Sequence, residues 1–431
     1  MPVNATNSEL GRHLLTMRGF HFIFGASGDP YALLLRAESD DPAVLGRQVR
    51  GRGKLYKSDA FAWVTGDREL GAKILRDPRL ELRHADGAED QQQHVLQDVW
   101  TDPKGCHVLP LDDAFMNLGR ADYERLTGLA EPFLGKGKVD RYRPEVERIA
   151  GEALDGRHGE FDLMADFARK AAVRTVGSLV GLPVHQQADF AALCSGLGVA
   201  LDAGLCPPQL NTARLLVASV DKLKDMFTEL IEARRAESRN DLISDLLRAA
   251  GQDAPATEDT LAIAMLMSVV GIEVAANLVC NAMALLFEHP GQWSSLCDDP
   301  SLAAGAIEET LRYAPPIRLE NRIAREDFEL EGEEIKADGQ VVVLVEAANR
   351  DPEAYPDPDS FDIARKPAVE SLSLSGGMYT GFLAPLVRLQ ATEALRTLAS
   401  RLPDLRQKES VLRRMRSPVA RGVLRFPVEA A

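Results

Sequence analysis

A long apolar segment around residue 270 constrains the fold of this chain more than any other feature. It runs from Leu261 to Phe287 and is interrupted by Glu273, Asn277 and Asn281. Its length is sufficient to cross a bilayer. The three polar residues, however, lie four positions apart and therefore share one helical face. An apolar helix with one polar stripe is typical of the centre of a large helical domain, and we predict that structure in preference to a membrane span.

The flanking residues predict where this helix begins and ends. Thr257 is expected to cap its N-terminus, with Glu258 and Asp259 in the first turn. The run His289-Pro290-Gly291 is expected to end it. A capped helix of about 30 residues would be about 45 Å long.

Composition and charge narrow the class of protein. The 431-residue chain is 45% hydrophobic, so it can bury a large core. It contains neither a Pro/Ser/Gly-rich linker nor an internal repeat, which favours one large domain. The formal net charge of −15 argues against nucleic acid and against an anionic membrane surface as partners, because both select basic proteins.

The cysteines, the histidines and the first residues indicate a cytoplasmic protein without a metal site. The first ten residues lack the basic and then apolar pattern of a signal peptide. None of the eight histidines shows the i, i+4 spacing of a helical metal pair. The five cysteines are an odd number without paired short spacing, which predicts reduced thiols: Cys106, Cys194, Cys206, Cys280 and Cys297.

Hydrophobic periodicity predicts a mainly α fold with a small β portion. Helical patterns cover, among others, Val139–Leu154, Phe161–Val180 and Asn211–Arg235. Strand patterns occur at Lys54–Thr65, Phe328–Leu330 and Gln340–Val345, and the turn pair Asp338-Gly339 between the last two predicts a hairpin. The polar stretch from Ala85 to Asp113 is predicted to be a long loop.

A charged pair followed by a proline-rich run provides the first recognisable motif. Glu309 and Arg312 share a helical face and can form a charge-assisted pair. They precede Tyr313–Pro316, and about 35 residues later come Ala348–Pro352 and Tyr355–Arg365. This order is similar to the K helix and meander of the bacterial cytochrome P-450 family. The resemblance implies that Arg365 joins Glu309 and Arg312 in a structural lock, which is a folding device and not a catalyst.

The segment Leu374–Leu386 resembles the haem loop of the same family, Phe-Gly-x-Gly-x-His-x-Cys-x-Gly followed by Ala-Pro-Leu-Ala-Arg. Aligned without a gap on Ala384-Pro385-Leu386 and Arg388, the haem-ligating cysteine of the family falls on Gly381. The second glycine of the motif is kept as Gly377. The other positions that matter to the haem are replaced by different residue types, namely Leu374, Ser375, Tyr379 and Leu383.

Two further family motifs are also incomplete. Val270–Ala275 is similar to the family's Ala-Gly-x-Glu/Asp-Thr-Thr segment, in which the acid and the first threonine guide protons to iron-bound oxygen. Glu273 is kept, but Val274 stands in place of that threonine and lacks its hydroxyl. Ala121–Leu126 aligns with the family's His-x-x-x-Arg without a histidine, and Arg125 matches the arginine.

The resemblance covers nearly the whole chain and implies a P-450-like domain over residues 29–431, behind an N-terminal extension over residues 1–28. A kept scaffold without the cysteine resembles the haem-free auxiliary proteins of actinobacterial antibiotic pathways. These proteins bind and activate the glycosyltransferase that moves a nucleotide-activated deoxysugar onto a macrolide or anthracycline aglycone. The resemblance therefore implies a pseudoenzyme without cofactor or redox partner that forms a hetero-oligomer with a glycosyltransferase; no sequence pattern locates the partner surface.

Two alternatives stay open. An atypical haem monooxygenase would need another axial ligand, for which Tyr379 and Met378 are chemically suitable. A haem-free carrier would hold a small molecule in the former substrate cavity, with Ala85–Asp113 as its lid and the polar groups of Glu273, Asn277 and Asn281 facing that space. The slot of the haem is otherwise expected to be filled by apolar side chains such as Met378, Phe382 and Leu383.

Overall fold

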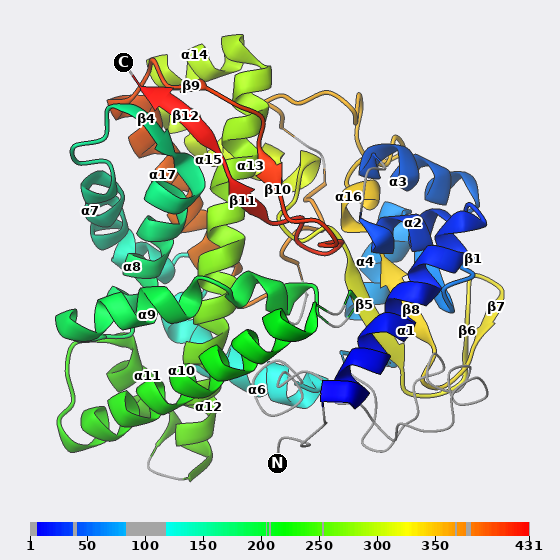
Figure 1. Cartoon of the computed structure of the whole chain (residues 1–431), viewed down its shortest axis with the longest axis horizontal. Coiled ribbons are helices and arrows are strands. Elements are labelled where there is room, and N and C mark those ends of the chain that lie inside the picture. The colour runs from blue at the N-terminus through cyan, green and yellow to red at the C-terminus, as the bar shows by residue number, and fades with distance from the viewer. Residues whose placement is uncertain are drawn as a thin grey trace.

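The computed structural model describes residues 7–37, 41–82, 118–203, 205–206, 208–251, 254–366, 369–375 and 381–430. The predicted loop Ala85–Asp113 lies outside these residues. Figure 1 shows a larger helical part and, beside it, a smaller part that contains the five-stranded sheet and the first helices of the chain. The mainly α fold with a small β portion is confirmed by this arrangement and by the fold comparisons reported below.

Helices make up most of the described chain. The predicted helix Asn211–Arg235 lies within a longer helix, and Val139–Leu154 contains one. Phe161–Val180 also contains a helix, but its first two residues belong to a strand, so the predicted start is wrong. The main helices are α1 Asn7–Ala26, α2 Pro30–Arg36, α3 Pro42–Gly51, α4 Arg68–Arg76, α6 Arg120–Leu134, α7 Arg143–Ala153, α8 Arg169–Leu179, α9 Gln187–Cys194, α10 Leu210–Ala236, α11 Leu242–Ala250, α12 Ala254–Leu266, α13 Ala275–Glu288, α14 Pro290–Asp298, α15 Ala303–Tyr313, α16 Val345–Ala348 and α17 Ala384–Arg401.

The largest sheet has five strands in the order β1-β2-β8-β5-β3. Only the pair of β2 and β8 is parallel. Smaller sheets pair β4-β12-β9, β10-β11 and β6-β7. The strand bounds are β1 Tyr56–Lys57, β2 Ala62–Thr65, β3 Leu80–Glu81, β4 Gly159–Asp162, β5 Glu320–Ala324, β6 Phe328–Leu330, β7 Glu333–Ile335, β8 Gln340–Val343, β9 Arg406–Gln407, β10 Leu412–Arg413, β11 Val423–Arg425 and β12 Pro427–Ala430.

The predicted hairpin between Phe328–Leu330 and Gln340–Val345 is wrong. Both strands exist, but β6 pairs with β7, whereas β8 lies between β2 and β5 in the five-stranded sheet. The apolar run of β8 explains this difference, because a strand that is buried on both faces belongs in the interior of a sheet and not in an isolated ribbon. Asp338-Gly339 still forms a turn, in which the Gly339 N–H donates to the carbonyl of Lys336.

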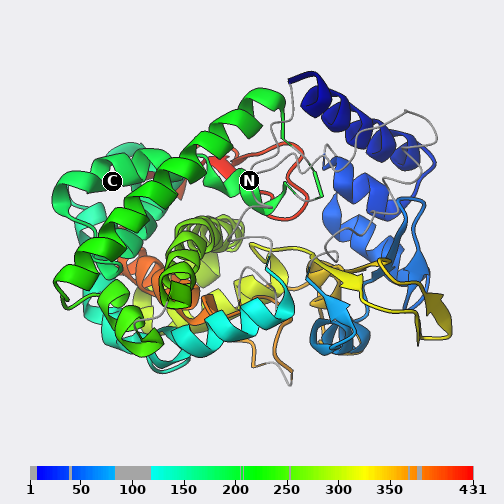
Figure 2. The same ribbon diagram turned by 90° about the horizontal axis from the view of Figure 1, so that it is seen from below.

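The apolar segment forms the central helix of the protein. It consists of α12, a π-helical segment Met267–Val274, and α13, and its apolar window is entirely buried. Figure 2 looks nearly along this helix, which is surrounded by the other helices. It is therefore a core helix of this fold, as predicted, and it ends at Glu288 before His289-Pro290.

The expected N-cap of this helix is wrong. Thr257 lies inside α12, which already begins at Ala254. Alanine is the best helix former and threonine can continue a helix, so the capping preference of Thr257 does not determine the first turn.

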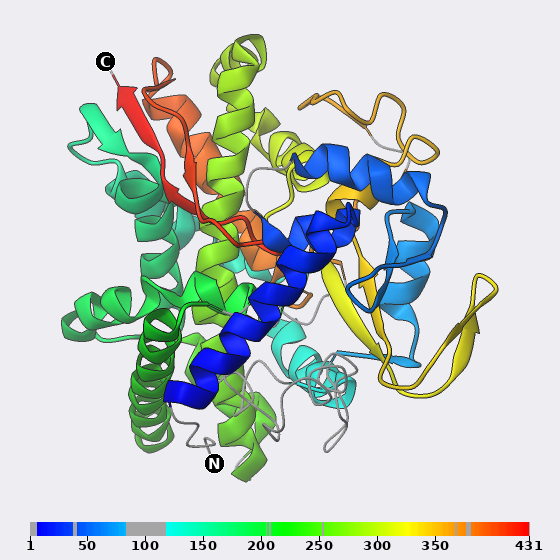
Figure 3. The ribbon, with the colours of Figure 1, turned by 45° about the vertical axis from the view of Figure 1, so that its right-hand side comes forward.

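Helix α1 falls within residues 1–28 and packs against α2 of the main domain. Figure 3 shows it crossing the front of the molecule. Its Phe24 ring meets Phe61 edge to face, with ring centroids 5.5 Å apart. His21 is also buried, and the loss of hydration lowers its pKa from 6.5 to about 4. The division of the chain at residue 28 itself stays a prediction.

Burial of His21 should make the docking of α1 sensitive to pH. Above pH 6.5 the imidazole is neutral in both states. As the pH falls from 6.5 towards 4, an undocked helix binds a proton that the docked helix does not, so stability is lost in this window, by roughly 3 kcal/mol in total. Hydrogen exchange of residues 7–26 measured at pH 7.5 and 4.8 should show this loss of protection.

The variant His21→Phe should keep its protection at the lower pH, because it removes the titrating group without removing the packing. His185→Gln, at an exposed position, should behave like the wild type. Equal pH dependence in His21→Phe and in the wild type would contradict this explanation.

Candidate functional site

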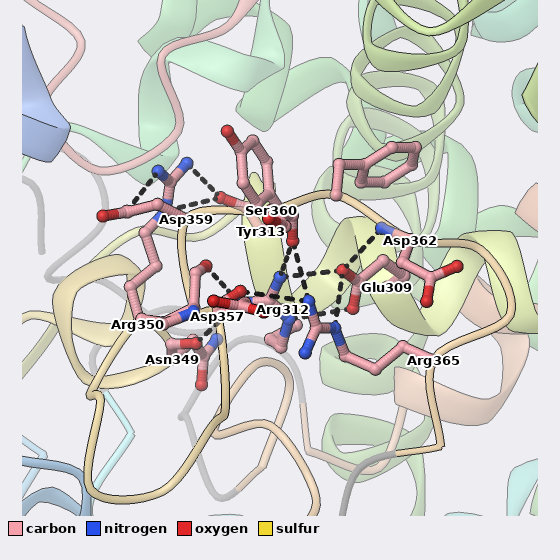
Figure 4. Close-up of polar contacts among 12 residues, drawn as sticks. Glu309, Arg312, Tyr313, Asn349, Arg350, Asp357, Asp359, Ser360, Asp362 and Arg365 are labelled. Atoms are coloured by element: carbon pink, nitrogen blue, oxygen red, sulfur yellow. Dashed lines mark hydrogen bonds and ion pairs between the residues drawn. The ribbon is translucent and has the colours of Figure 1, made fainter.

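The structure brings Glu309, Arg312 and Arg365 together. The Arg312 guanidinium donates to both carboxylate oxygens of Glu309, at 2.8 Å from Nε to Oε2 and 2.7 Å from Nη2 to Oε1. Arg365 Nε donates to the same Oε1 at 3.1 Å, as Figure 4 shows. Glu309 and Arg312 are buried, so this is an interior pair and not a solvated one. Glu309, Arg312 and Arg365 together form the structural lock.

The lock joins α15 to the irregular segment 349–365. Arg312 donates its remaining N–H groups to three carbonyls of that segment, those of Asn349, Pro358 and Ser360. The N–H of Asp362 donates to Glu309 Oε1 at 3.0 Å. Each buried charge is thereby both paired and hydrogen-bonded, which is the condition for tolerating an ion pair in a protein interior.

Asn349 extends this network towards the loop that carries Gly381. Its Nδ2 donates to Ser373 Oγ at 2.8 Å, and its Oδ1 accepts from the N–H of Leu372 at 2.8 Å. The segment that leads into the loop is thus attached to the same framework as the lock. Gly377, Met378 and Tyr379 lie outside the described residues, whereas Leu374, Gly381 and Leu383 lie within them.

Apolar side chains after Gly381 belong to the main hydrophobic core. Phe382 and Leu383 are buried, and Leu383 directly precedes the first turn of α17. The ring of Phe382 packs against Tyr123 of α6, with centroids 6.0 Å apart. Both side chains are therefore covered by protein, whereas their filling of a vacated haem slot stays a prediction.

Arg125, which matches an arginine of the family motif, forms ion pairs with two aspartates of this chain. Its guanidinium binds Asp259 of α12 with both Nε and Nη2, at 3.0 to 3.2 Å, and its Nη1 donates to Asp122 at 2.9 Å. These two carboxylates raise the pKa of Arg125, so it is firmly cationic. It joins α6 to the beginning of the central helix.

Glu273 faces an arginine and not a free space. Arg169 of α8 donates to it at 3.0 Å from Nε to Oε1 and at 3.3 Å from Nη2 to Oε2. Glu273 is 1% exposed, and a Cβ on Gly198 would overlap its carboxylate, so the acid is enclosed by protein. Val274 beside it is equally buried and has no group that could relay a proton.

The other members of the polar stripe are also satisfied within the chain. Asn277 accepts from the N–H of Val423 at 2.7 Å and donates to the carbonyl of Glu273 at 2.8 Å. Asn281 donates to the carbonyl of Ala314 at 3.0 Å and accepts from Arg413 at 2.9 Å. The polar face of the central helix therefore connects this helix to neighbouring elements. The side-chain amides of Asn277 and Asn281 are both hydrogen-bonded within the chain.

Comparisons with known proteins place this framework in a family. The Cytochrome P450 family model matches residues 301–366, the stretch that holds the lock. EryCII of Saccharopolyspora erythraea, described as a cytochrome P450 family protein, is 32% identical over 97% of this chain and 98% of its own length. The chain belongs to the cytochrome P450 family.

Two further similarities refine this assignment. Protein AknT of Streptomyces galilaeus is 49% identical over 98% of this chain and 96% of its own length. Among solved structures, ligand-free CYP164A2 of Mycobacterium smegmatis superposes with a TM-score of 0.78 at 27% identity, covering 93% of this chain and 99% of that one. The similarity to P450 proteins thus extends over nearly the whole chain.

The described residues do not fit a thiolate-ligated haem. Gly381 stands where the family motif aligns its ligand, Glu273 is bound by Arg169, and Arg125 is bound by Asp259. Burial raises the pKa of Cys206 and of Cys280 to about 12, which keeps both as thiols in this structure. Among the residues that the structure describes, no cluster of three or more His, Cys, Asp or Glu is arranged to hold a metal ion.

The partners Arg169 and Asp259 could not be identified from the sequence. Arg169 is 104 residues from Glu273, and Asp259 is 134 residues from Arg125. Arg169 lies at the start of the amphipathic helix α8, where a charged residue is ordinary, and Asp259 follows Glu258 near the start of the central helix. The one indication in the sequence is that Glu273 is an acid on an apolar helix, because a buried carboxylate requires a cation nearby. The sequence does not indicate which cation this is.

Removal of the Glu309 charge should destabilise the protein severely. Glu309→Gln keeps the shape of the side chain but leaves the buried guanidinium of Arg312 without its counter-ion, and we expect a loss of about 3–5 kcal/mol. Urea unfolding followed by circular dichroism measures this loss. The matched control is Glu69→Gln, which breaks the exposed i, i+4 pair with Lys73 and should leave the midpoint unchanged. Similar midpoints for both variants would show that the lock contributes no special stability.

Restoring the cysteine alone should not restore a haem protein. Gly381→Cys supplies the ligand atom but leaves Leu383 in the core and Glu273 and Arg125 in their ion pairs. After expression with a haem precursor, the purified variant should show neither a Soret band nor a ferrous carbon monoxide spectrum. A stoichiometric haem spectrum in this single variant would mean that the other replacements are compatible with the cofactor.

Proposed function

We propose that this chain is a non-catalytic auxiliary protein that binds, stabilises and activates a glycosyltransferase of antibiotic biosynthesis. The transferase would move a nucleotide-activated deoxysugar onto a polyketide aglycone of the macrolide or anthracycline type. The observation that carries the proposal is the contrast between a complete P450 scaffold and haem-contact positions engaged in other interactions. The end-to-end similarity to AknT and EryCII supports it.

Activation without chemistry has a simple physical basis. A partner that binds only the folded, competent state of an enzyme stabilises that state by mass action, by about 2.7 kcal/mol at a concentration 100 times the Kd. It also raises the fraction of the enzyme in the active conformation. The auxiliary protein needs only a rigid surface for this task, and the lock and the satisfied polar stripe supply rigidity without a cofactor. A hetero-oligomer in the cytoplasm is the state that this role requires.

The two alternatives are weakened by the same contacts. A haem monooxygenase would need oxygen-activating groups, but Glu273 is bound by Arg169 and Val274 has no hydroxyl. A carrier that recognises its ligand through Glu273, Asn277 and Asn281 would need these groups to be available, and all three have partners in the chain. Neither alternative gains a specific supporting observation among the described residues.

Co-expression with candidate glycosyltransferases of antibiotic pathways tests the proposal. The transferase should be retained by the tagged auxiliary protein, should turn over its sugar donor and aglycone faster in the pair, and should unfold at a higher temperature in the pair than alone. The unfolding-prone Glu309→Gln variant serves as the control and should give no increase. Equal turnover and equal thermal stability with and without the wild-type chain would refute activation.

A further inference from the structure

We infer that a groove between α8 and α9 receives an apolar side chain of the partner protein together with one neighbouring carboxylate. This inference rests on the proposed function, since it identifies a surface through which the partner would be held. Both helices lie in the larger helical part of the molecule, away from the five-stranded sheet (Figure 1). The cavity that their residues line has a volume of about 250 Å³.

The groove has the shape and lining of an anchor site. Its apolar wall is formed by Val173 of α8 and the ring of Phe190 of α9, and small residues such as Gly177 leave the space open. Its volume is below the usual range of ligand pockets, about 300–1,000 Å³, and suits one or two side chains better than a complete small molecule. Buried apolar anchors in such pockets carry most of the binding energy in protein interfaces.

An exposed apolar residue lies close in the chain to the lining of the groove. Val184 is three residues before the lining residue Gln187, and its side chain is 84% exposed, the highest value among the exposed large apolar residues of the described chain. Exposed apolar side chains of this kind are often covered in a complex.

The rim of the groove is basic although the protein as a whole is acidic. Three cations line it, Arg169, Lys170 and Arg174. Arg169 is bound by Glu273 and Arg174 by Glu152, whereas Lys170 forms no ion pair with any residue that the structure describes. One cation is therefore available for a new partner, so the complementary segment carries one carboxylate next to its apolar anchor. The net charge of −15 repels an acidic segment from most other places on the surface.

Gly177 permits a direct test of the groove. A Cβ at this position would meet only Phe190 and Leu182, at 3.6 Å or more, which is ordinary contact. The first carbon of a larger side chain therefore fits at this position. We expect Gly177→Leu to fill the groove from its floor, and replacing a helical glycine favours α8. We expect a melting temperature equal to or above that of the wild type and an increase of tenfold or more in the Kd for the transferase.

Gly128→Leu is the matched control. Gly128 lies in helix α6, is exposed, and would place its Cβ in open space, so the same substitution there should leave the Kd unchanged. The charge is tested by Lys170→Glu, which should weaken binding several-fold and reduce its dependence on salt. Lys224→Glu, at an exposed position of α10, is its control and should have no comparable effect.

These outcomes separate the groove from the proposed function. If wild-type protein does not bind or activate the transferase, the proposed function fails. If the wild type binds and Gly177→Leu, folded by its melting temperature, binds equally well, the groove is not the docking site. Should Gly177→Leu not fold, Lys170→Glu decides, and unchanged affinity in that variant rejects the groove. Loss of binding in both leucine variants to the same extent also rejects it.

Discussion

The buried ion pair between Glu309 and Arg312 organises the part of this protein on which the P450 scaffold depends. Because a guanidinium in the interior is tolerated only when every donor finds an acceptor, Arg312 determines where the carbonyls of the segment 349–365 must lie. Asn349 in turn hydrogen-bonds Leu372 and Ser373, and so fixes the segment that leads into the loop around Gly381. A segment with little regular structure is thereby held in one conformation by charge and hydrogen bonding. This network makes no use of a cofactor.

A P450 scaffold that loses its haem contacts must still satisfy the polar groups of its interior. Here two charged groups have a partner on a different element: Glu273 binds Arg169 of α8, and Arg125 of α6 binds Asp259 of the central helix. Gln390 of α17 donates to the carbonyl of Gly271, within the π-helical segment where regular helix hydrogen bonding is interrupted. Three helices are thus joined to the central helix by side chains. The interior is connected by protein contacts and needs no ligand for that purpose.

Sequence spacing correctly predicted the features that depend only on residues close together in the chain. The central helix, its polar face and the pairing of Glu309 with Arg312 follow from spacings of three and four residues, which a single helix enforces. The partner of β6 and the first turn of α12 were predicted wrongly, because strand pairing and helix starts depend on burial by distant elements. Arg169 and Asp259 were not predicted at all, since contacts across more than 100 residues leave no periodic trace. The absence of a ligating cysteine was inferred from the motif residues Ala384–Leu386 and Arg388 that follow Gly381, and it stays a prediction.

The position of Arg169 connects the two roles of helix α8. Its guanidinium neutralises the buried carboxylate of Glu273, while its stem belongs to the wall of the groove between α8 and α9. This neutralisation matters because an unpaired buried charge would favour the unfolded state. The same pairing leaves Lys170 as the one cation of the rim with no partner among the described residues. The ion pair between Arg169 and Glu273 therefore both satisfies the interior and defines the charge that the surface presents.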